Sequence, residues 1–146
     1  MILFSSALEL RIKKNKTMND LIIDATTNKI FLTIIKDTKN IYTSKFENSK
    51  NNFDKLIILI DDLLNKNKLL IKNLSRIYVN RGPGSFAGIR NSISVVKAFN
   101  VAKKIDYYCY SLEDFKGETD VSYENIPNLC DKFKIKKNLI NPIYLS

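Results

Sequence analysis

The spacing of hydrophobic positions changes near residue 51 of the chain. Before that point, residues 21–24, 29–35 and 41–46 form short runs rich in apolar and β-branched side chains. The segments between them, 24–28 and 37–40, are rich in Asp, Asn and Thr, which favour turns. Short β-branched runs separated by turn residues predict three strands joined as an antiparallel meander.

From Asn51 onward the apolar positions follow the 3.6-residue period of a helix. At 100° per residue they fall within an arc of about 160°, and the side chains concerned are Phe53, Leu56, Ile57, Leu59, Ile60, Leu63 and Leu64. The pattern further predicts a strand over 76–80, a helix over 85–104, a strand over 105–111 and a short helix over 127–133. The main order, βββαβαβ, defines an α/β layered architecture.

The helix predicted over 85–104 has a wider apolar arc than packing on a sheet requires. Its apolar and small side chains span about 200°, about twice the width of an ordinary core-facing stripe. Either a partner protein or the first helix covers the surplus, and the pattern alone leaves both alternatives open. The side chains in this arc are Phe86, Gly88, Ile89, Ser92, Ile93, Val95, Val96, Phe99 and Ala102.

The composition fits a single globular domain, since 45% of the 146 residues are hydrophobic. The longest uninterrupted apolar run is 56–60, far below the roughly 18 residues that a membrane-spanning helix needs. The sequence contains no His, which removes Ser-His and Cys-His nucleophile pairs and most zinc sites. Cys109 and Cys130 have no CxxC partner, so we expect reduced thiols, no metal site and a cytoplasmic protein.

The net charge of +9 comes from 20 Lys and 4 Arg against 15 acidic residues. Lys, Ile and Asn together make up 57 of the 146 residues, a composition that codon drift in a genome poor in G and C explains. A phosphate-binding surface would favour the forked guanidinium of Arg and would cluster its charge. A basic module that binds RNA directly is therefore an alternative and not the leading hypothesis.

Three of the four glycines lie close together at positions 82, 84 and 88, directly after the strand predicted over 76–80. Gly82 and Gly84 predict a sharp turn, Ser85 is placed to cap the following helix, and Gly88 indicates close approach of another segment. The same stretch matches the dinucleotide-binding pattern G-x-G-x-x-G/A. Pro83 removes an amide donor from that pattern, so a small nucleotide-binding protein is a second alternative.

The segment RGPGSFAGIR at residues 81–90 resembles the signature R-G-P-G-S-F-T-G-L/I-R of the TsaB (YeaZ-type) family and departs from it mainly at Ala87. LIIDATTN at residues 21–28 is similar to the family's first strand and following loop, and PIYLS at 142–146 to its P-x-Y-L-R ending. The similarity covers roughly residues 18–115 and the last five residues. It implies the N-terminal lobe of an actin and sugar-kinase-like (ASKHA, ribonuclease H-like) fold.

The resemblance implies a non-catalytic scaffold subunit that binds and stabilises TsaD, which transfers the threonylcarbamoyl group to adenosine 37 of tRNA. The chain would then have no cofactor of its own, since ATP and the metal belong to the partner subunits, and it would meet tRNA only indirectly. A TsaE-type ATPase joins this complex, and the two helices of the lobe form the interface with TsaD. The interface residues we expect are Leu56, Leu59, Leu63, Gly88, Ser92, Val95, Phe99 and Ala102. The apolar arcs also predict a homodimer of the isolated chain through the same helices.

Active members of this superfamily carry Asp-x-Gly-Thr after the first strand, where the glycine lets the backbone approach the phosphates. Thr26 occupies that glycine position in the sequence Asp24-Ala25-Thr26-Thr27, so the resemblance implies a degenerate phosphate loop. We expect Asp24 to be a turn residue that binds its own backbone and not a metal ligand. The signature turn comprises Arg81, Gly82, Pro83, Gly84, Ser85, Phe86, Gly88 and Arg90.

The chain divides into three predicted segments. Residues 1–17 are an N-terminal extension, with translation from Met18 as the alternative. Residues 18–115 form the lobe, and residues 116–146 form a linker and a short C-terminal latch, a degenerate remnant of the family's second lobe. Pairing with TsaD is expected to survive this reduction, whereas recruitment of TsaE is left open.

Overall fold

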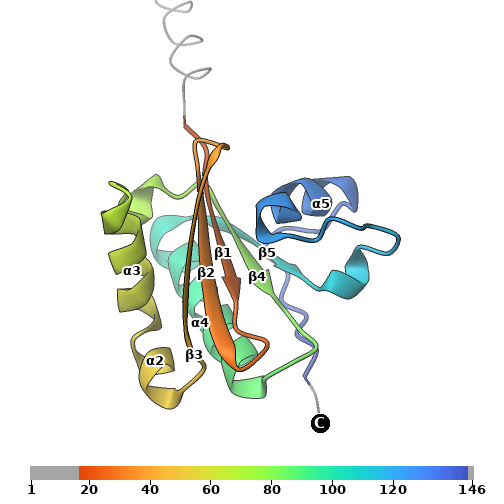
Figure 1. The fold of residues 1–146 in the computed structure, drawn as a ribbon, viewed down its shortest axis with the longest axis horizontal. Coiled ribbons are helices and arrows are strands. Elements are labelled where there is room, and N and C mark those ends of the chain that lie inside the picture. The colour runs from red at the N-terminus through yellow and green to blue at the C-terminus, as the bar shows by residue number, and fades with distance from the viewer. Residues whose placement is uncertain (1–16, 145–146) are drawn as a thin grey trace, which may run out of the picture.

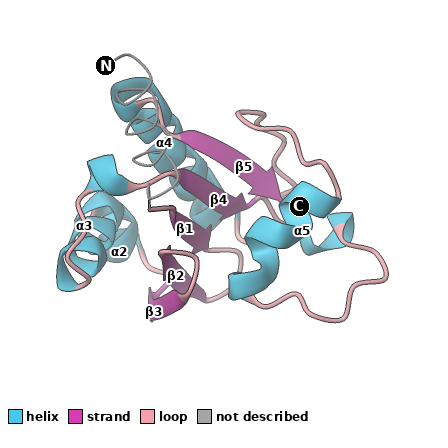
Figure 2. Ribbon diagram, turned by 90° about the horizontal axis from the view of Figure 1, so that it is seen from above, coloured by secondary structure: helices cyan, strands magenta, loops and turns pink. Residues whose placement is uncertain are grey.

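A five-stranded mixed sheet forms the centre of the protein, whose computed structural model describes residues 17–144. Residues 1–16 of the predicted extension lie outside the described residues. The strands are β1 (Asn19–Asp24), β2 (Lys29–Lys36), β3 (Asn40–Glu47), β4 (Arg76–Asn80) and β5 (Asp106–Tyr110). The helices are α2 (Lys50–Asp54), α3 (Leu56–Lys66), α4 (Phe86–Lys103) and α5 (Ile126–Lys132). Helices α2, α3 and α4 lie on one side of the sheet and α5 on the other (Figures 1 and 2).

The strand order across the sheet is β3-β2-β1-β4-β5. β1, β2 and β3 pair antiparallel, which confirms the predicted meander, while β4 joins β1 in parallel and β5 joins β4 in parallel. Every residue of β1 is buried. A central strand covered on both faces has this burial, whereas a strand with one wet face would alternate.

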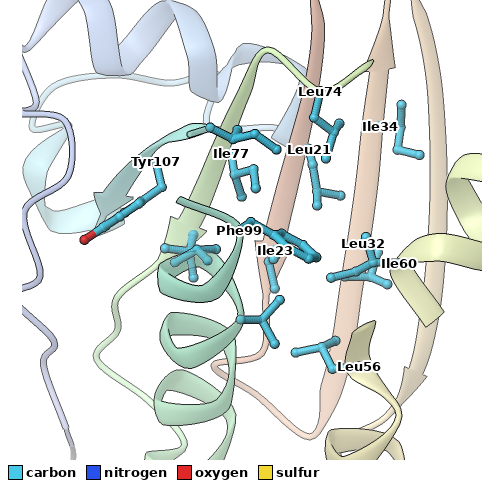
Figure 3. Close-up of a cluster of buried hydrophobic side chains, with 14 of the residues drawn as sticks. Leu21, Ile23, Leu32, Ile34, Leu56, Ile60, Leu74, Ile77, Phe99 and Tyr107 are labelled. Carbon is cyan, nitrogen blue, oxygen red and sulfur yellow. The ribbon is translucent and has the colours of Figure 1, made fainter. Parts of the chain in front are cut away.

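The larger core cluster lies between the sheet and helices α3 and α4. Leu56 and Ile60 of α3 and Phe99 of α4 meet the inward-facing residues of β1 and β2, such as Leu21 and Leu32 (Figure 3). These contacts bury the apolar arcs of both helices against the sheet and against each other. The wide arc predicted for α4 is therefore covered to a large extent within the chain.

The helix predicted from Asn51 is two helices, because the backbone leaves the helical conformation at Lys55 (φ −105°, ψ 9°). After this break, α3 buries residues spaced by three and four positions. Ile57 was predicted to lie in the apolar arc, and that was wrong, since it is 47% exposed. On a wheel of α3 alone, Ile57 lies 100° from Leu56, at the edge of the buried arc, so a position inside the predicted arc was not enough to bury it. The buried residues of α3 are Leu56, Ile60, Leu63 and Leu64.

The second face of the sheet is covered by residues 112–135, most of which we had predicted to be a linker. Tyr110 of β5 stacks on Phe115 with ring centroids 5.9 Å apart, and Phe115 contacts Phe133 at 5.6 Å. Ile126 and Leu129 of α5 complete this smaller cluster. The short helix predicted over 127–133 is confirmed as α5, but the surrounding segment packs on the sheet and is no free tether.

Candidate functional site

The signature turn connects β4 to α4. Asn80, at the end of β4, is buried, and its side-chain oxygen accepts a hydrogen bond from Gly82 N at 3.0 Å. Gly82 has φ +110°, a conformation that side-chain-bearing residues rarely adopt. The hydroxyl of Ser85 accepts a hydrogen bond from Gly88 N at 3.1 Å, which confirms the predicted helix cap. The turn is thus fixed at both of its ends.

The loop after β1 is closed by the carboxylate of Asp24. One oxygen, Oδ1, accepts hydrogen bonds from Thr26 N at 3.1 Å and from Thr26 Oγ1 at 2.7 Å. This is the local turn bonding that we predicted for Asp24. The other oxygen, Oδ2, accepts a hydrogen bond from the Tyr123 hydroxyl at 2.8 Å. Tyr123 lies 99 residues after Asp24, and nothing in the sequence indicated this contact.

The signature turn and the loop after β1 touch through backbone. Ser85 N donates to Thr26 O at 2.8 Å. A Cβ added to Gly84 would lie 2.4 Å from Thr26 O, and one added to Gly88 would lie 1.9 Å from Ala25 O. The close approach predicted for Gly88 is real, but its neighbour is this chain's own loop and not a partner protein.

Arg81 attaches the C-terminal latch to the signature turn. Its main-chain N–H donates to Tyr110 O, and its main-chain carbonyl accepts from Ile143 N, both at 2.7 Å. Its guanidinium donates through Nη1 to Asn141 O at 3.0 Å. Gly84 forms a parallel bridge with Tyr144, whose ring centroid lies 4.7 Å from that of Phe86.

The three segments that carry the family resemblance therefore meet at one end of the sheet. The loop after β1 contacts the signature turn, and the signature turn contacts residues 141–144. Arg90 lies beside the same turn, with its guanidinium carbon 5.9 Å from the centre of the Phe86 ring. In this chain, therefore, the residues of the three segments hold one another in position.

The chemistry available at this cluster is limited. The amide of Thr26 and the carboxylate of Asp24 already bond each other, and the amide of Ser85 bonds Thr26 O. Among residues 17–144, no three His, Cys, Asp or Glu side chains lie close enough to hold a metal ion. Burial raises the pKa of the Cys109 thiol to about 11 and that of the Cys130 thiol to about 12, so neither is a thiolate nucleophile near neutral pH.

Most of the residues that we predicted to form a partner interface lie inside the protein. Leu56, Leu63, Gly88, Ser92, Val95 and Phe99 are buried, Leu59 is half-buried and Ala102 is exposed. Phe99 is only 6% exposed and points into the cluster between α4 and the sheet (Figure 3). The prediction was wrong for the six buried residues, because the sheet, the other helix and the loop after β1 cover both apolar arcs.

The exposed faces of α3 and α4 carry a different set of residues, which sequence reasoning missed. Ile57 and Ile58 of α3 are 47% and 58% exposed, and Val101 of α4 is 82% exposed. The exposed positions of α4 repeat at intervals of three and four residues, and they include Ala87, Ser94, Ala98 and Val101. These two rows, called the helix face below, could have been found by removing the core positions from the helical wheel.

No described helix is long and apolar enough to cross a membrane.

The fold and the motif cluster define a class of protein. A mixed α/β sheet with helices on both faces, like that of YeaZ, is of the actin-like (ASKHA) type and is consistent with the N-terminal lobe of such proteins. Residues 46–111 match the family model for TsaD, described as tRNA N6-adenosine threonylcarbamoyltransferase.

A curated relative and two solved structures narrow the class. The chain is 28% identical over 92 residues to the tRNA threonylcarbamoyladenosine biosynthesis protein TsaB of Buchnera aphidicola subsp. Schizaphis graminum, covering 62% of this chain and 44% of the relative. YeaZ from Pseudomonas aeruginosa superposes with a TM-score of 0.60 at 21% identity, covering 65% of this chain and 44% of that one. A second crystal structure, of an uncharacterized protein similar to peptidase YEAZ from the same organism, gives the same values.

Over part of its length the chain is similar to the TsaB (YeaZ-type) family. The two solved structures support the fold, and the sequence signature and the curated relative support the similarity to the family. The chain spans less than half the length of the relatives that it matches.

Proposed function

We propose that this chain is a non-catalytic subunit in the formation of threonylcarbamoyladenosine in tRNA, and that it binds and stabilises a TsaD-type partner. The observation that carries the proposal is the helix face of α3 and α4, which presents Ile57, Ile58 and Val101 to solvent beside small side chains. Exposed apolar side chains on two adjacent helices favour association with another helical surface.

The partner's own fold supports this pairing. Residues 46–111 of this chain, which include α3 and α4, match the TsaD family model, so a TsaD-type protein carries a related helix pair. Related surfaces can pack about a pseudo-twofold axis, as identical surfaces do in symmetric dimers. The same face would serve a homodimer of the isolated chain, which the TsaD-type partner would displace.

The closed loop after β1 supports a subunit without catalysis of its own. Nucleotide-binding members need bare backbone at the position of Thr26, whereas here Thr26 bonds Asp24 and receives the amide of Ser85. ATP, the metal and a TsaE-type ATPase would belong to the other subunits. Calorimetric titration of the isolated chain with ATP separates this proposal from the nucleotide-binding alternative, since micromolar binding would favour the alternative.

Co-expression with the cognate TsaD, followed by size-exclusion chromatography, tests the proposal directly. The double variant Ala98→Glu/Val101→Glu places two charges on the helix face and should weaken co-purification at least about tenfold, because a charge buried without a partner costs several kcal/mol. Leu112→Glu, at an exposed apolar position outside this face, is the control and should co-purify like the wild type. A double variant that keeps full affinity would show that α4 is not the interface.

A further inference from the structure

The excess positive charge of residues 17–144 gathers at one end of the sheet. Residues 17–144 contain 20 Lys and Arg against 14 Asp and Glu, a net charge of +6. Three segments, 36–39, 66–72 and 103–104, contain seven Lys and a single acidic residue, Asp37, which also gives +6. The remaining described residues are therefore neutral overall. Codon drift alone would scatter the excess lysines over the whole surface, so their gathering at one end is a property of the folded protein.

The pairing of the strands explains why these segments meet. β1, β4 and β5 all begin at this end of the sheet, where Asp20 pairs with Arg76 and Arg76 with Asp106, and β2 ends there at Lys36. Lys36 Nζ donates to Asn67 O at 2.8 Å, which ties the end of β2 to the end of α3. We call this surface the lysine pole; its members are Lys36, Lys39, Lys66, Lys68, Lys72, Lys103 and Lys104.

A hollow at the lysine pole brings the end of α4 beside the start of β4. Lys72, Lys103 and Lys104 line this cavity of about 540 Å³, together with residues 73–75. Its volume lies within the roughly 300–1,000 Å³ typical of small-ligand sites. The C-terminal end of α4 carries roughly half a negative charge, which stabilises Lys103 and Lys104 there and offsets only part of their two positive charges. The ion pairs among residues 17–144 all use cations outside the pole, so no carboxylate in this range neutralises a lysine of the pole.

We propose that the lysine pole binds the phosphate backbone of RNA, so that the chain contacts tRNA directly. Clustered ammonium groups that form no ion pair among residues 17–144 displace condensed counterions when they meet a polyphosphate backbone. Lysines supply no base-specific pattern here, so the contact positions the RNA and does not read its sequence. The choice of tRNA as the RNA rests on the proposed function, while the electrostatic argument does not.

An anionic membrane surface is the competing partner for a cluster of lysines. Membrane-binding surfaces combine cations with a broad apolar face that inserts among the lipids. The hollow at the pole is lined by Lys, Asn, Ser and Thr side chains together with Met18, Leu74 and Ile105, of which Leu74 and Ile105 are buried. Leu70 and Val101, each two residues from a lysine of the pole, are 50% and 82% exposed. Two separate side chains do not make a broad apolar face, so the observations favour RNA.

Fluorescence anisotropy with labelled, unmodified tRNA at 50–300 mM KCl tests the inference on the isolated full chain. The pole variant is Lys72→Glu/Lys103→Glu/Lys104→Glu. Its matched control, Lys45→Glu/Lys50→Glu/Lys116→Glu, changes the net charge equally at exposed positions elsewhere. The pole variant should bind at least about tenfold more weakly at 100 mM KCl, with a salt slope shallower by about 2–3, while the control changes affinity less than about threefold.

Three outcomes would overturn the inference: no binding by the wild type, equal losses in both triple variants, or tighter binding to phosphatidylserine vesicles than to tRNA. Thermal melts check that the variants fold, and the corresponding Gln variants replace any Glu variant that does not. If the chain co-purifies with TsaD but does not bind tRNA, this inference is wrong and the proposed function stands. If the chain binds tRNA through the pole but does not co-purify with TsaD, the proposed function is wrong and this inference stands.

Discussion

Arg81 and Asp114 form an ion pair, with Arg81 Nη2 2.7 Å from Asp114 Oδ1, across 33 residues of sequence. Both side chains are largely buried, and Asp114 also accepts a hydrogen bond from Ser111 N at 2.8 Å. The pair joins the first residue of the signature turn to the segment that covers the second face of the sheet. The signature arginine therefore has a structural task inside this chain.

Replacing Asp114 with Asn should lower the free energy of unfolding by about 1–3 kcal/mol, because it leaves the Arg81 charge without its counterion in a mostly buried place. Urea denaturation measures the change. Glu47→Gln is the control, since Glu47 pairs with Lys29 and its own side chain is largely exposed. An exposed pair of that kind contributes up to about 1 kcal/mol. Equal effects of the two substitutions would contradict the structural role of the Arg81 pair.

A methyl group at position 88 should destabilise the protein although it improves helix propensity. In an open helix, Gly→Ala gains about 1 kcal/mol, but the added Cβ of Gly88→Ala would meet Ala25 O at 1.9 Å. We expect a net loss of about 1–3 kcal/mol from overpacking. Ala98→Gly, on the exposed side of the same helix, reports the propensity effect alone. A stabilised Gly88→Ala variant would show that α4 does not pack on the loop after β1.

Two tyrosines in the second core cluster should respond oppositely to loss of the hydroxyl. The Tyr123 hydroxyl donates to Asp24 Oδ2, so Tyr123→Phe should cost about 1–2 kcal/mol. The Tyr78 hydroxyl is buried without a hydrogen-bond partner among the described residues, so Tyr78→Phe should be neutral or stabilising. Thermal denaturation of the two single variants measures the change in stability that each substitution causes. A Tyr78→Phe loss as large as that of Tyr123→Phe would refute this difference.

The buried thiols should make stability fall at alkaline pH. A thiol in an unfolded chain has a pKa near 8.5, whereas burial holds the pKa of Cys109 at about 11 and that of Cys130 at about 12. Their contribution is fully present below pH 8.5 and is lost as the pH rises toward these folded values. Cys130→Ala should make the decline between pH 9 and 11 shallower by up to about 1.4 kcal/mol per pH unit. Urea titrations at several pH values measure it, and an unchanged slope would mean that Cys130 titrates normally in the folded state.

The strands and helices were largely predictable because each depends on local spacing. The three strands of the meander, the strands β4 and β5, and the helices α4 and α5 all appear within a few residues of their predicted bounds. The break at Lys55 has no sequence signal of the usual kind, since neither Gly nor Pro stands there. Ile57 was misplaced for another reason: it lies at the edge of the apolar arc of α3, where the wheel alone does not decide between burial and exposure.

The functional surfaces were harder to predict, because burial depends on segments distant in the sequence. Phe99 belongs to an apolar arc in the sequence, but only the position of α3 and the sheet decides that it faces the core. Phe115, Ile126 and Leu129 are too irregularly spaced to indicate a covered sheet face, although they form one. Similarly, Gly88 indicated a close neighbour, and the sequence could not show that this neighbour is Ala25, 63 residues earlier.

The bridge between Gly84 and Tyr144 determines when the signature turn can form its last contacts during synthesis of the chain. A ribosome synthesises residue 84 well before residue 144, so the signature turn waits for 60 further residues before its last neighbour exists. Until then the carbonyl of Arg81 and the ring of Phe86 lack the contacts that Ile143 and Tyr144 provide. Closing so long a loop carries an entropic cost that only the finished fold offsets. The signature turn therefore acquires its complete set of contacts late, after the sheet that carries it has been synthesised.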